Sequence, residues 1–271
     1  MRYLKGSISL EFRDKELLHL VADARYITHS QLFQLLRLKA LEFKRAVLNW
    51  RVRRLVTSGL LRKQVVAYLG TDALYSITRG GIQALEEMGV TYLGGYVERE
   101  KDPHEVQIPH VLELIRIRLA LERSSALAFW IPETFIRVLN LSPALCYAKA
   151  YDAVVRVNLG DGVSTEFAIE YERTLKSEQK YEKIVEAIAG ERRLHTILYL
   201  APSYEIVATL RWYFQRTRHE ILLAQVDDFK TDVLDTRVDL ANTYRRMTLR
   251  EALVRSASQA KASVFGSQPH G

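Results

Sequence analysis

Apolar residues recur at helical spacing in three consecutive segments of the first 90 residues, and each segment carries a helix boundary signal. The first predicted helix begins at Asp14, the second is capped by Thr28, and the third starts at residue 41 and stops at Gly59. Two apolar segments, 60–70 and 73–78, then flank a Gly-Thr-Asp turn signal and predict a β-hairpin, which a further helix over 79–89 closes.

Three helices followed by a hairpin is the order of the winged-helix variant of the helix-turn-helix, in which the third helix enters the major groove of DNA. The charge distribution also favours a DNA-binding function for this part of the chain. Residues 1–90 hold 15 Lys and Arg against 8 Asp and Glu, whereas residues 91–271 hold 24 of each, so the net charge of +7 lies entirely in the first third. A basic module joined to a neutral one indicates a nucleic-acid-binding part attached to something else. A merely basic domain, or a winged helix used only for dimerisation, stays open as an alternative.

The third predicted helix carries the side chains expected to contact DNA. Helical spacing places Arg45, Asn49 and Arg53 on one stripe, with Lys44 and Arg51 a turn of the wheel away. Arginine and asparagine bond guanine and adenine edges in pairs, while lysine mostly neutralises phosphate. These five residues therefore form the predicted recognition surface.

Two further features border that surface. Arg62 and Lys63, at the start of the hairpin, are expected to reach the DNA backbone beside the groove. Phe43, Val47 and Trp50 form a separate apolar line on the same helix, which we expect to face the core.

Hydrophobic patterns in the second part alternate between strand and helix. Helices are expected over 108–124, 177–190 and 203–217, and strands over 126–132, 151–160, 163–172, 195–202 and 219–225. The predicted order is αβββαβαβ, an α+β or α/β domain.

Composition sets the domain limits and the compartment. We expect a DNA-binding domain over 1–92, a Gly-, Pro- and charge-rich linker over 93–105, a second domain over 106–255 and a disordered, small and polar tail over 256–271. The single cysteine, Cys146, cannot form an internal disulfide, and neither a signal peptide nor a membrane-spanning segment is evident. These features predict a soluble cytoplasmic protein without a membrane partner.

Carboxylates interrupt the otherwise apolar strand over 163–172. Glu170 and Glu172 are two residues apart, so both point to one face of the strand. If Gly160, Asp161 and Gly162 form a three-residue hairpin loop, Asp152 lies opposite Glu170 and joins that face. A strict two-residue turn would move it to the other side.

Three carboxylates on one face would repel each other unless a cation neutralised them. Oxygen ligands suit Mg²⁺ or Mn²⁺, which can generate a nucleophilic hydroxide and stabilise the leaving oxygen in phosphodiester cleavage. The sequence therefore predicts a metal site formed by Asp152, Glu170 and Glu172.

The order αβββαβ, with Asp152 opening one strand and Glu-Tyr-Glu ending the next, resembles the PD-(D/E)XK or restriction-endonuclease-like nucleases. That resemblance implies catalytic carboxylates and an assisting lysine two positions beyond the second of them. Glu172 occupies the lysine position here. A lysine displaced onto the following helix could serve, and Lys180 is the first choice.

A wider resemblance covers nearly the whole chain. The segments WRVRRLVTSGLL, LYSITRGGIQAL, PHVLELIRIRLAL and FAIEYERTLKS, in this order, resemble the replication-relaxation family, which includes MobC-type plasmid mobilisation relaxases. The resemblance implies a metal-dependent, site- and strand-specific DNA nickase acting on double-stranded DNA at a plasmid transfer origin, with mobilisation accessory or coupling proteins as partners. A twofold homodimer would suit an inverted-repeat target.

Two other functions stay open. The protein could be a plasmid replication or transcription regulator with a catalytically inactive nuclease-like domain, or an interaction module that recruits the transfer or replication machinery. The first needs only the winged helix, and the second would require an exposed apolar patch on the second domain.

Overall fold

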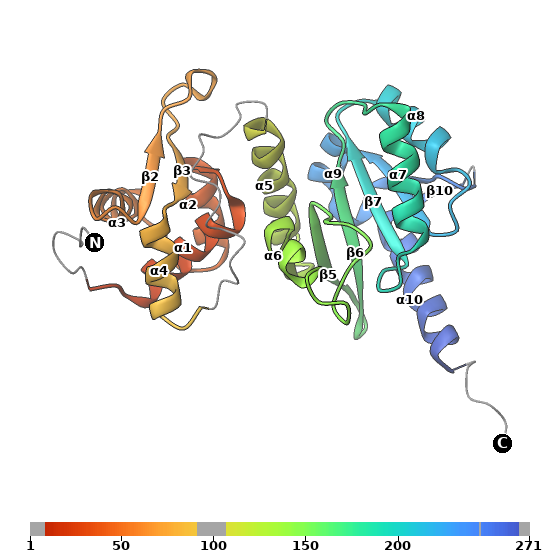
Figure 1. Ribbon diagram of the computed structural model, residues 1–271, viewed down its shortest axis with the longest axis horizontal. Helices are drawn as coiled ribbons and strands as arrows, with labels where there is room; N and C mark the ends of the chain where they lie inside the picture. Colours follow the sequence, from red (N-terminus) through yellow and green to blue (C-terminus); the bar gives the residue numbers. More distant parts are fainter. Residues whose placement is uncertain (1–8, 91–106, 244, 266–271) are drawn as a thin grey trace. The chain divides into compact units, whose positions relative to one another are not determined.

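The structure, a computed structural model, describes residues 9–90, 107–243 and 245–265. It divides the chain into two compact units, Met1–Leu119 and Ala120–Gly271, which are described separately below (Figure 1). The predicted linker over 93–105 lies outside the described residues.

Unit 1 contains three helices, a small sheet and two further helices, in the predicted order. Its elements are α1 (Phe12–Ala24), β1 (Ile27–Thr28), α2 (His29–Leu38), α3 (Arg45–Thr57), β2 (Leu61–Gln64), the short 3₁₀ helix η1 (Ala67–Leu69), β3 (Leu74–Ile77), α4 (Arg79–Glu87) and α5 (Ile108–Arg123), which continues into unit 2. The strands form an antiparallel sheet in the order β1-β3-β2. This topology is that of a winged helix, with the β2–β3 hairpin as the wing.

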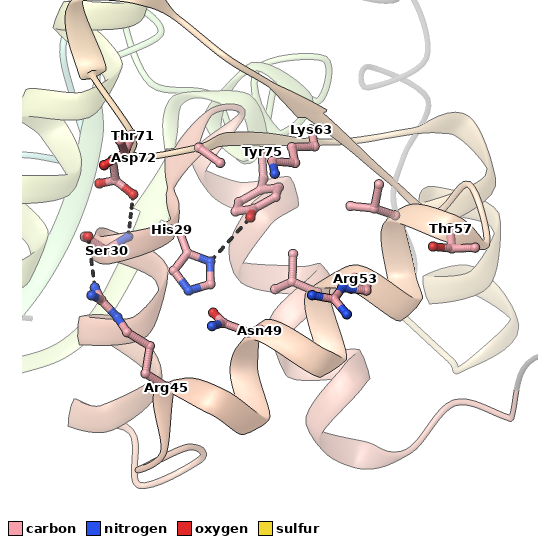
Figure 2. A pocket seen from close by; sticks show the side chains of 13 residues that line it. His29, Ser30, Arg45, Asn49, Arg53, Thr57, Lys63, Thr71, Asp72 and Tyr75 are labelled. Carbon is pink, nitrogen blue, oxygen red and sulfur yellow. Dashed lines mark hydrogen bonds between the residues drawn. The ribbon is translucent and has the colours of Figure 1, made fainter.

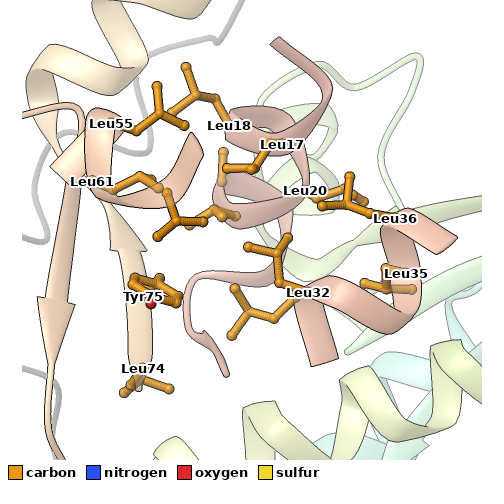
Figure 3. Close-up of a cluster of buried hydrophobic side chains, with 14 of the residues drawn as sticks. Leu17, Leu18, Leu20, Leu32, Leu35, Leu36, Leu55, Leu61, Leu74 and Tyr75 are labelled. Atoms are coloured by element: carbon orange, nitrogen blue, oxygen red, sulfur yellow. The ribbon is translucent and has the colours of Figure 1, made fainter. Parts of the chain in front are cut away.

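Leucines dominate the core of unit 1 (Figure 3). Leu17 and Leu18 of α1, Leu32 of α2 and Leu48 and Leu55 of α3 have almost no exposed surface. They bury the apolar faces of the three helices against each other, which is the main source of stability for such short helices.

The first part of α5 belongs to the same core. Ile108, Val111, Leu112 and Ile115 are buried in it, and the Gln31 side-chain amide donates to the Leu112 carbonyl (2.9 Å). The division between the units thus lies within α5, whereas the sequence analysis placed it before this helix. The reason is the apolar face of α5, whose partner cannot be read from its sequence.

Helix boundaries in unit 1 differ from the predictions at two positions. Helix α1 begins at Phe12 with Glu11 as its N-cap, so Asp14 is the third helical residue of a capping box rather than the cap. Helix α3 begins at Arg45, four residues later than expected. Thr28 caps α2 as predicted, because its side chain accepts from the Gln31 N–H.

Unit 2 is built on a seven-stranded mixed sheet in the order β10-β9-β8-β7-β6-β5-β4. The β4–β5–β6 and β8–β9–β10 pairs are antiparallel, and the β6–β7–β8 pairs are parallel. The strands are β4 (Leu127–Pro132), β5 (Ala153–Gly160), β6 (Val163–Tyr171), β7 (Thr196–Ala201), β8 (Glu220–Gln225), β9 (Arg237–Leu240) and β10 (Arg246–Thr248).

Within the described residues, unit 2 contains the two helices expected over 177–190 and 203–217, together with three α-helices and one short 3₁₀ helix that were not expected. The further elements are α6 (Glu133–Leu139), α7 (Glu178–Ala189), α8 (Tyr204–Phe214), α9 (Val226–Asp232), η2 (Val233–Asp235) and α10 (Leu249–Phe265). The principal order αβββαβαβ is present, with α6 inserted between β4 and β5. Helix α10 continues through part of the predicted tail, because Ser256 and Ala257 are buried and the Ser256 hydroxyl bonds Thr196 Oγ1 (2.7 Å).

Candidate nucleic-acid interface and carboxylate cluster

The exposed side of α3 carries most of the predicted DNA-contacting side chains. Arg45, Asn49 and Arg53 are exposed along one stripe of the helix, and all three line an open hollow of about 460 Å³ (Figure 2). Lys63 of β2 lines the same hollow, so the stripe and the wing share it. Lys44 and Arg62 are also exposed. Six predicted contacts are thus on the surface of unit 1.

Arg51 lies on the opposite side of α3 and is buried. Its Nη1 donates to Asp14 Oδ1 (2.7 Å), and it lies among Leu48, Val52 and Leu55 on the inward face. The prediction that Arg51 contacts DNA is therefore corrected. At about 100° per residue, Arg51 is about 200° around the helix from both Asn49 and Arg53, so helical spacing already places it on the side away from the stripe. What the sequence does not show is that a buried carboxylate of α1 lies there as its partner.

Asp14 is fully buried and joins α1 to α3 through two arginines. Besides Arg51, the Arg54 guanidinium donates to Asp14 Oδ2, and the Glu11 N–H donates to the same oxygen (3.0 Å). Burial alone would raise the pKa of the Asp14 carboxyl, but the Glu11 N–H and the two guanidinium groups outweigh it and lower that pKa. The charged network fixes the inward face of α3, and so the direction of its outer stripe.

Two aromatic residues predicted to face the core are exposed instead. Phe43 is 66% and Trp50 is 57% exposed, and the Arg54 guanidinium lies 5.0 Å from the centre of the Trp50 ring. The inward face of α3 is already filled by leucine, valine and Arg51. Trp50 therefore packs under an arginine at the surface, a cation–π arrangement.

The floor of the hollow was not predicted. His29 Nδ1 lies 3.4 Å from the Tyr75 hydroxyl, and burial lowers the pKa of His29, with the Arg45 charge adding to the effect. Asp72 Oδ1 accepts from the Ser30 N–H (3.1 Å) at the start of α2, and Arg45 Nη2 donates to the Ser30 hydroxyl (3.0 Å). The only signal for this group in the sequence is the turn that contains Asp72, which gives no indication of what the turn touches.

In unit 2, the β5–β6 hairpin has a two-residue turn but the strand register expected from a three-residue loop. Gly160 pairs with Val163, so Asp161 and Gly162 form a two-residue turn in which both residues have positive φ. An irregularity between Asn158 and Gly160 then restores the register, and Ala153 pairs with Ile169 as a three-residue loop would give. The predicted register of the strands is confirmed from Asn158 to Ala153, where the pairing ends one residue before Asp152.

The three predicted carboxylates gather at this end of the sheet. The Tyr171 N–H donates to Asp152 Oδ2 (2.8 Å), and the Asp152 charge acts on Glu170. Glu170 and Glu172 are buried, and Glu170 sits beside Tyr199 of β7 in the parallel register.

Each glutamate has a lysine partner that the sequence analysis did not choose. Lys149 Nζ lies 2.8 Å from Glu170 Oε1, and Lys176 forms an ion pair with Glu172. Lys180 is exposed in the first turn of α7. The structure therefore brings Lys149 and Lys176 to the carboxylates, where Lys180 was expected. Both lysines lie in irregular segments, Lys176 between β6 and α7 and Lys149 between α6 and β5, where no periodic spacing links a side chain to its partner.

The segment that carries Lys149 is held by a buried carboxylate. Glu191 Oε2 accepts from the Ala148 N–H (2.9 Å) and from the Tyr151 hydroxyl (3.0 Å). These bonds fix both sides of Lys149. The loop is thus anchored at the point where it delivers a positive charge to Glu170.

The arrangement is not that of a metal site with three ligands. Within the described residues, no group of three or more His, Cys, Asp or Glu side chains is arranged so that it could hold a metal ion. Lysine ammonium groups instead neutralise the two glutamates. A metal site shared by Asp152, Glu170 and Glu172 stays a prediction.

The Glu170 carboxyl is a weaker acid than an ordinary glutamate side chain. Burial raises the pKa of Glu170 to about 7; Lys149 opposes this, and the Asp152 charge adds to it. Because the pKa of this carboxyl is higher in the folded state than its ordinary 4.5, its protonation stabilises the folded state. The stabilisation is fully present below about pH 4.5. That contribution is lost as the pH rises through about 7.

Glu170→Gln is therefore expected to flatten the pH dependence of stability. As the pH rises from about 5 to about 8, the parent should lose on the order of 2 kcal/mol more than the variant, or several degrees of melting temperature. Thermal unfolding at a series of pH values measures this, and Glu178→Gln, at an exposed glutamate on α7, is the matched control. Parallel curves for parent and Glu170→Gln would contradict an elevated pKa.

Comparisons with known proteins give weak matches. No family model matches the chain, and no curated protein matches it. Among solved structures, the zinc-responsive MarR family member ZitR of Lactococcus lactis matches at 16% identity and a TM-score of 0.25, over 32% of this chain and 60% of ZitR. PadR of Bacillus subtilis, solved in complex with operator DNA, matches at 14% identity and a TM-score of 0.25, over 66% of this chain and 92% of PadR. The chain thus spans less than two thirds of ZitR. Similarity at this level does not indicate a function, which is therefore inferred from the geometry of the chain itself.

None of the described helices is both long enough and apolar enough to cross a membrane.

Proposed function

We propose that unit 1 binds duplex DNA and that the protein is a DNA-binding regulator. The observation that carries the proposal is the exposed stripe Arg45–Asn49–Arg53, which shares a hollow with Lys63 of the wing. A winged helix presents this face to the major groove. The buried Asp14 network on the reverse side of α3 supports it, because it fixes the direction of the stripe.

The side chains divide into two roles. Asn49 and Arg53, on the exposed stripe, have the donors and acceptors that distinguish base edges. Lys44, Arg62 and Lys63 supply charge to phosphate, which fixes the position of the protein without reading sequence. The protein should therefore have both a sequence preference and a large non-specific component.

Selection of binding sites from a pool of random duplexes tests this division. The parent chain should enrich a defined motif, and Arg53→Ala should relax the preference at one or two positions, at about 1–3 kcal/mol for each lost base contact. Lys63→Ala should weaken binding to all sequences alike. Equal preferences in the parent and in Arg53→Ala would show that α3 does not read the bases.

A second function, a metal-dependent nickase acting at a plasmid transfer origin, is favoured by one observation. Asp152, Glu170 and Glu172 gather at one end of a sheet together with Lys149 and Lys176. Acidic and lysine side chains in this combination are those that phosphodiester cleavage requires. As arranged, however, the glutamates face lysines, and Mg²⁺ or Mn²⁺ would have to replace those ammonium groups. The DNA-binding regulator is therefore the first proposal. Mobilisation proteins, or a second copy of the chain, are partners only if one of these two proposals is correct.

A further inference from the structure

The proposed DNA-binding hollow contains a carboxylate among its cations. Arg45, Arg53 and Lys63 line it from α3 and β2, and Asp72 lines it from the turn that leads into β3 (Figure 2). The negative charge of Asp72 acts electrostatically on both His29 and Tyr75, which line the floor of the hollow. A negative charge at a surface meant for phosphate opposes binding.

Asp72 is also held in a place that suits a phosphate oxygen. Its Oδ1 accepts from the Ser30 N–H at the first turn of α2, a helix of ten residues. The Ser30 hydroxyl in turn accepts from Arg45 Nη2 (3.0 Å). A backbone N–H, a hydroxyl and a guanidinium thus converge beside Asp72, and this donor set is the one that proteins use for phosphate.

We propose that Asp72 is an intramolecular competitor of the DNA backbone: it holds a negative charge in the hollow that duplex phosphate must approach, and so it limits non-specific affinity. This inference rests on the proposed DNA binding by unit 1. In free protein, Asp72 satisfies the Ser30 N–H and lowers the positive potential of the hollow. Only a duplex that gains enough from contacts to Arg45, Asn49 and Arg53 offsets the repulsion. Asp72 is therefore a specificity-determining residue.

The alternative role for Asp72 is purely structural. As a cap on the start of α2, it would stabilise the fold and position Ser30 and Arg45, and its loss would weaken DNA binding. Asp72→Asn separates the two roles, because asparagine retains an oxygen acceptor for the Ser30 N–H and loses only the charge. The competitor role predicts tighter binding, and the structural role predicts unchanged or weaker binding.

The experiment measures binding of the full chain to a labelled duplex of mixed sequence by fluorescence anisotropy over a range of salt concentrations. Asp72→Asn should bind about threefold to tenfold more tightly than the parent at low salt, and the gain should shrink as salt screens the charge. Glu86→Gln, at an exposed glutamate on α4, makes the same change in net charge away from the hollow and should give less than half of that gain. Melting temperatures of the two variants verify that the fold is retained.

The outcomes separate this inference from the function on which it rests. If the parent binds duplex DNA and Asp72→Asn binds no more tightly than Glu86→Gln, Asp72 is not a competitor, while the proposed function stands. If neither the parent nor Asp72→Asn binds any duplex at low salt, both proposals are overturned.

Discussion

Asp14→Ala is expected to unfold a large fraction of unit 1 and, with it, to remove DNA binding. Asp14 is fully buried and neutralises Arg51, which is also buried, and Arg54. Removing one partner of a buried ion pair costs about 3–5 kcal/mol, because a charge is left without compensation. That is a large part of the roughly 5–15 kcal/mol that stabilises a typical domain. The capping box of α1 is lost as well.

Chemical denaturation of the full chain measures this effect, with Glu86→Ala as an exposed control expected to change stability by less than about 0.5 kcal/mol. In a double-mutant cycle, Asp14→Ala combined with Arg51→Met should cost less than the sum of the two single changes, because neither charge is then left buried alone. An Asp14→Ala protein that unfolds within about 1 kcal/mol of the parent would show that the network does not hold α3 in place.

The second large effect concerns the carboxylate cluster. If the protein nicks DNA, Asp152→Asn, Glu170→Gln and Glu172→Gln should each reduce nicking of a supercoiled plasmid with the cognate origin by at least about 100-fold. Binding to duplex DNA should stay unchanged, since the proposed interface belongs to unit 1. These substitutions preserve side-chain shape, and melting temperatures of the variants verify that a loss of activity does not reflect misfolding. Nicking is followed on agarose gels in the presence of Mg²⁺ or Mn²⁺.

The lysines give a sharper version of the same test. Lys149→Ala and Lys176→Ala should slow nicking if an ammonium group that the metal ion displaces then contacts the scissile phosphate, whereas Lys180→Ala, on the exposed side of α7, should act as the matched control. A parent protein that leaves every origin-bearing plasmid intact with either metal ion would remove the nickase function and leave the regulator.

Local signals predicted most of the fold. Strand and helix periodicity gave the principal order of elements in both units, Thr28 and Gly59 marked helix ends, and the hairpin register placed Asp152 near Glu170. The short strands β9 and β10 were missed, because three or four residues carry too little alternation to be recognised.

Contacts between distant segments were the part that could not be predicted. Arg51 was assigned to the DNA-contacting surface although helical spacing places it on the side away from the stripe, and only the position of Asp14 on α1 explains how a charged residue can be buried there. Trp50 is apolar and was assigned to the core, yet it lies on the exposed side of α3, away from the buried Leu48 and Leu55. Lys149 and Asp72 act from loops, where no periodic pattern connects a side chain to its partner. These residues decide the chemistry of the two sites.

Duplex binding by the full chain as a function of salt tests the central claim most directly. Five exposed cationic residues lie on or beside the proposed interface, and they are Lys44, Arg45, Arg53, Arg62 and Lys63. If most of them neutralise phosphates, the logarithm of the binding constant should fall with the logarithm of salt concentration with a slope of about −3 to −4.5. Arg45→Glu combined with Arg53→Glu should make the slope shallower and weaken binding. No detectable binding of the parent to duplex DNA at about 50 mM salt, or a slope near zero, would contradict DNA binding through this face.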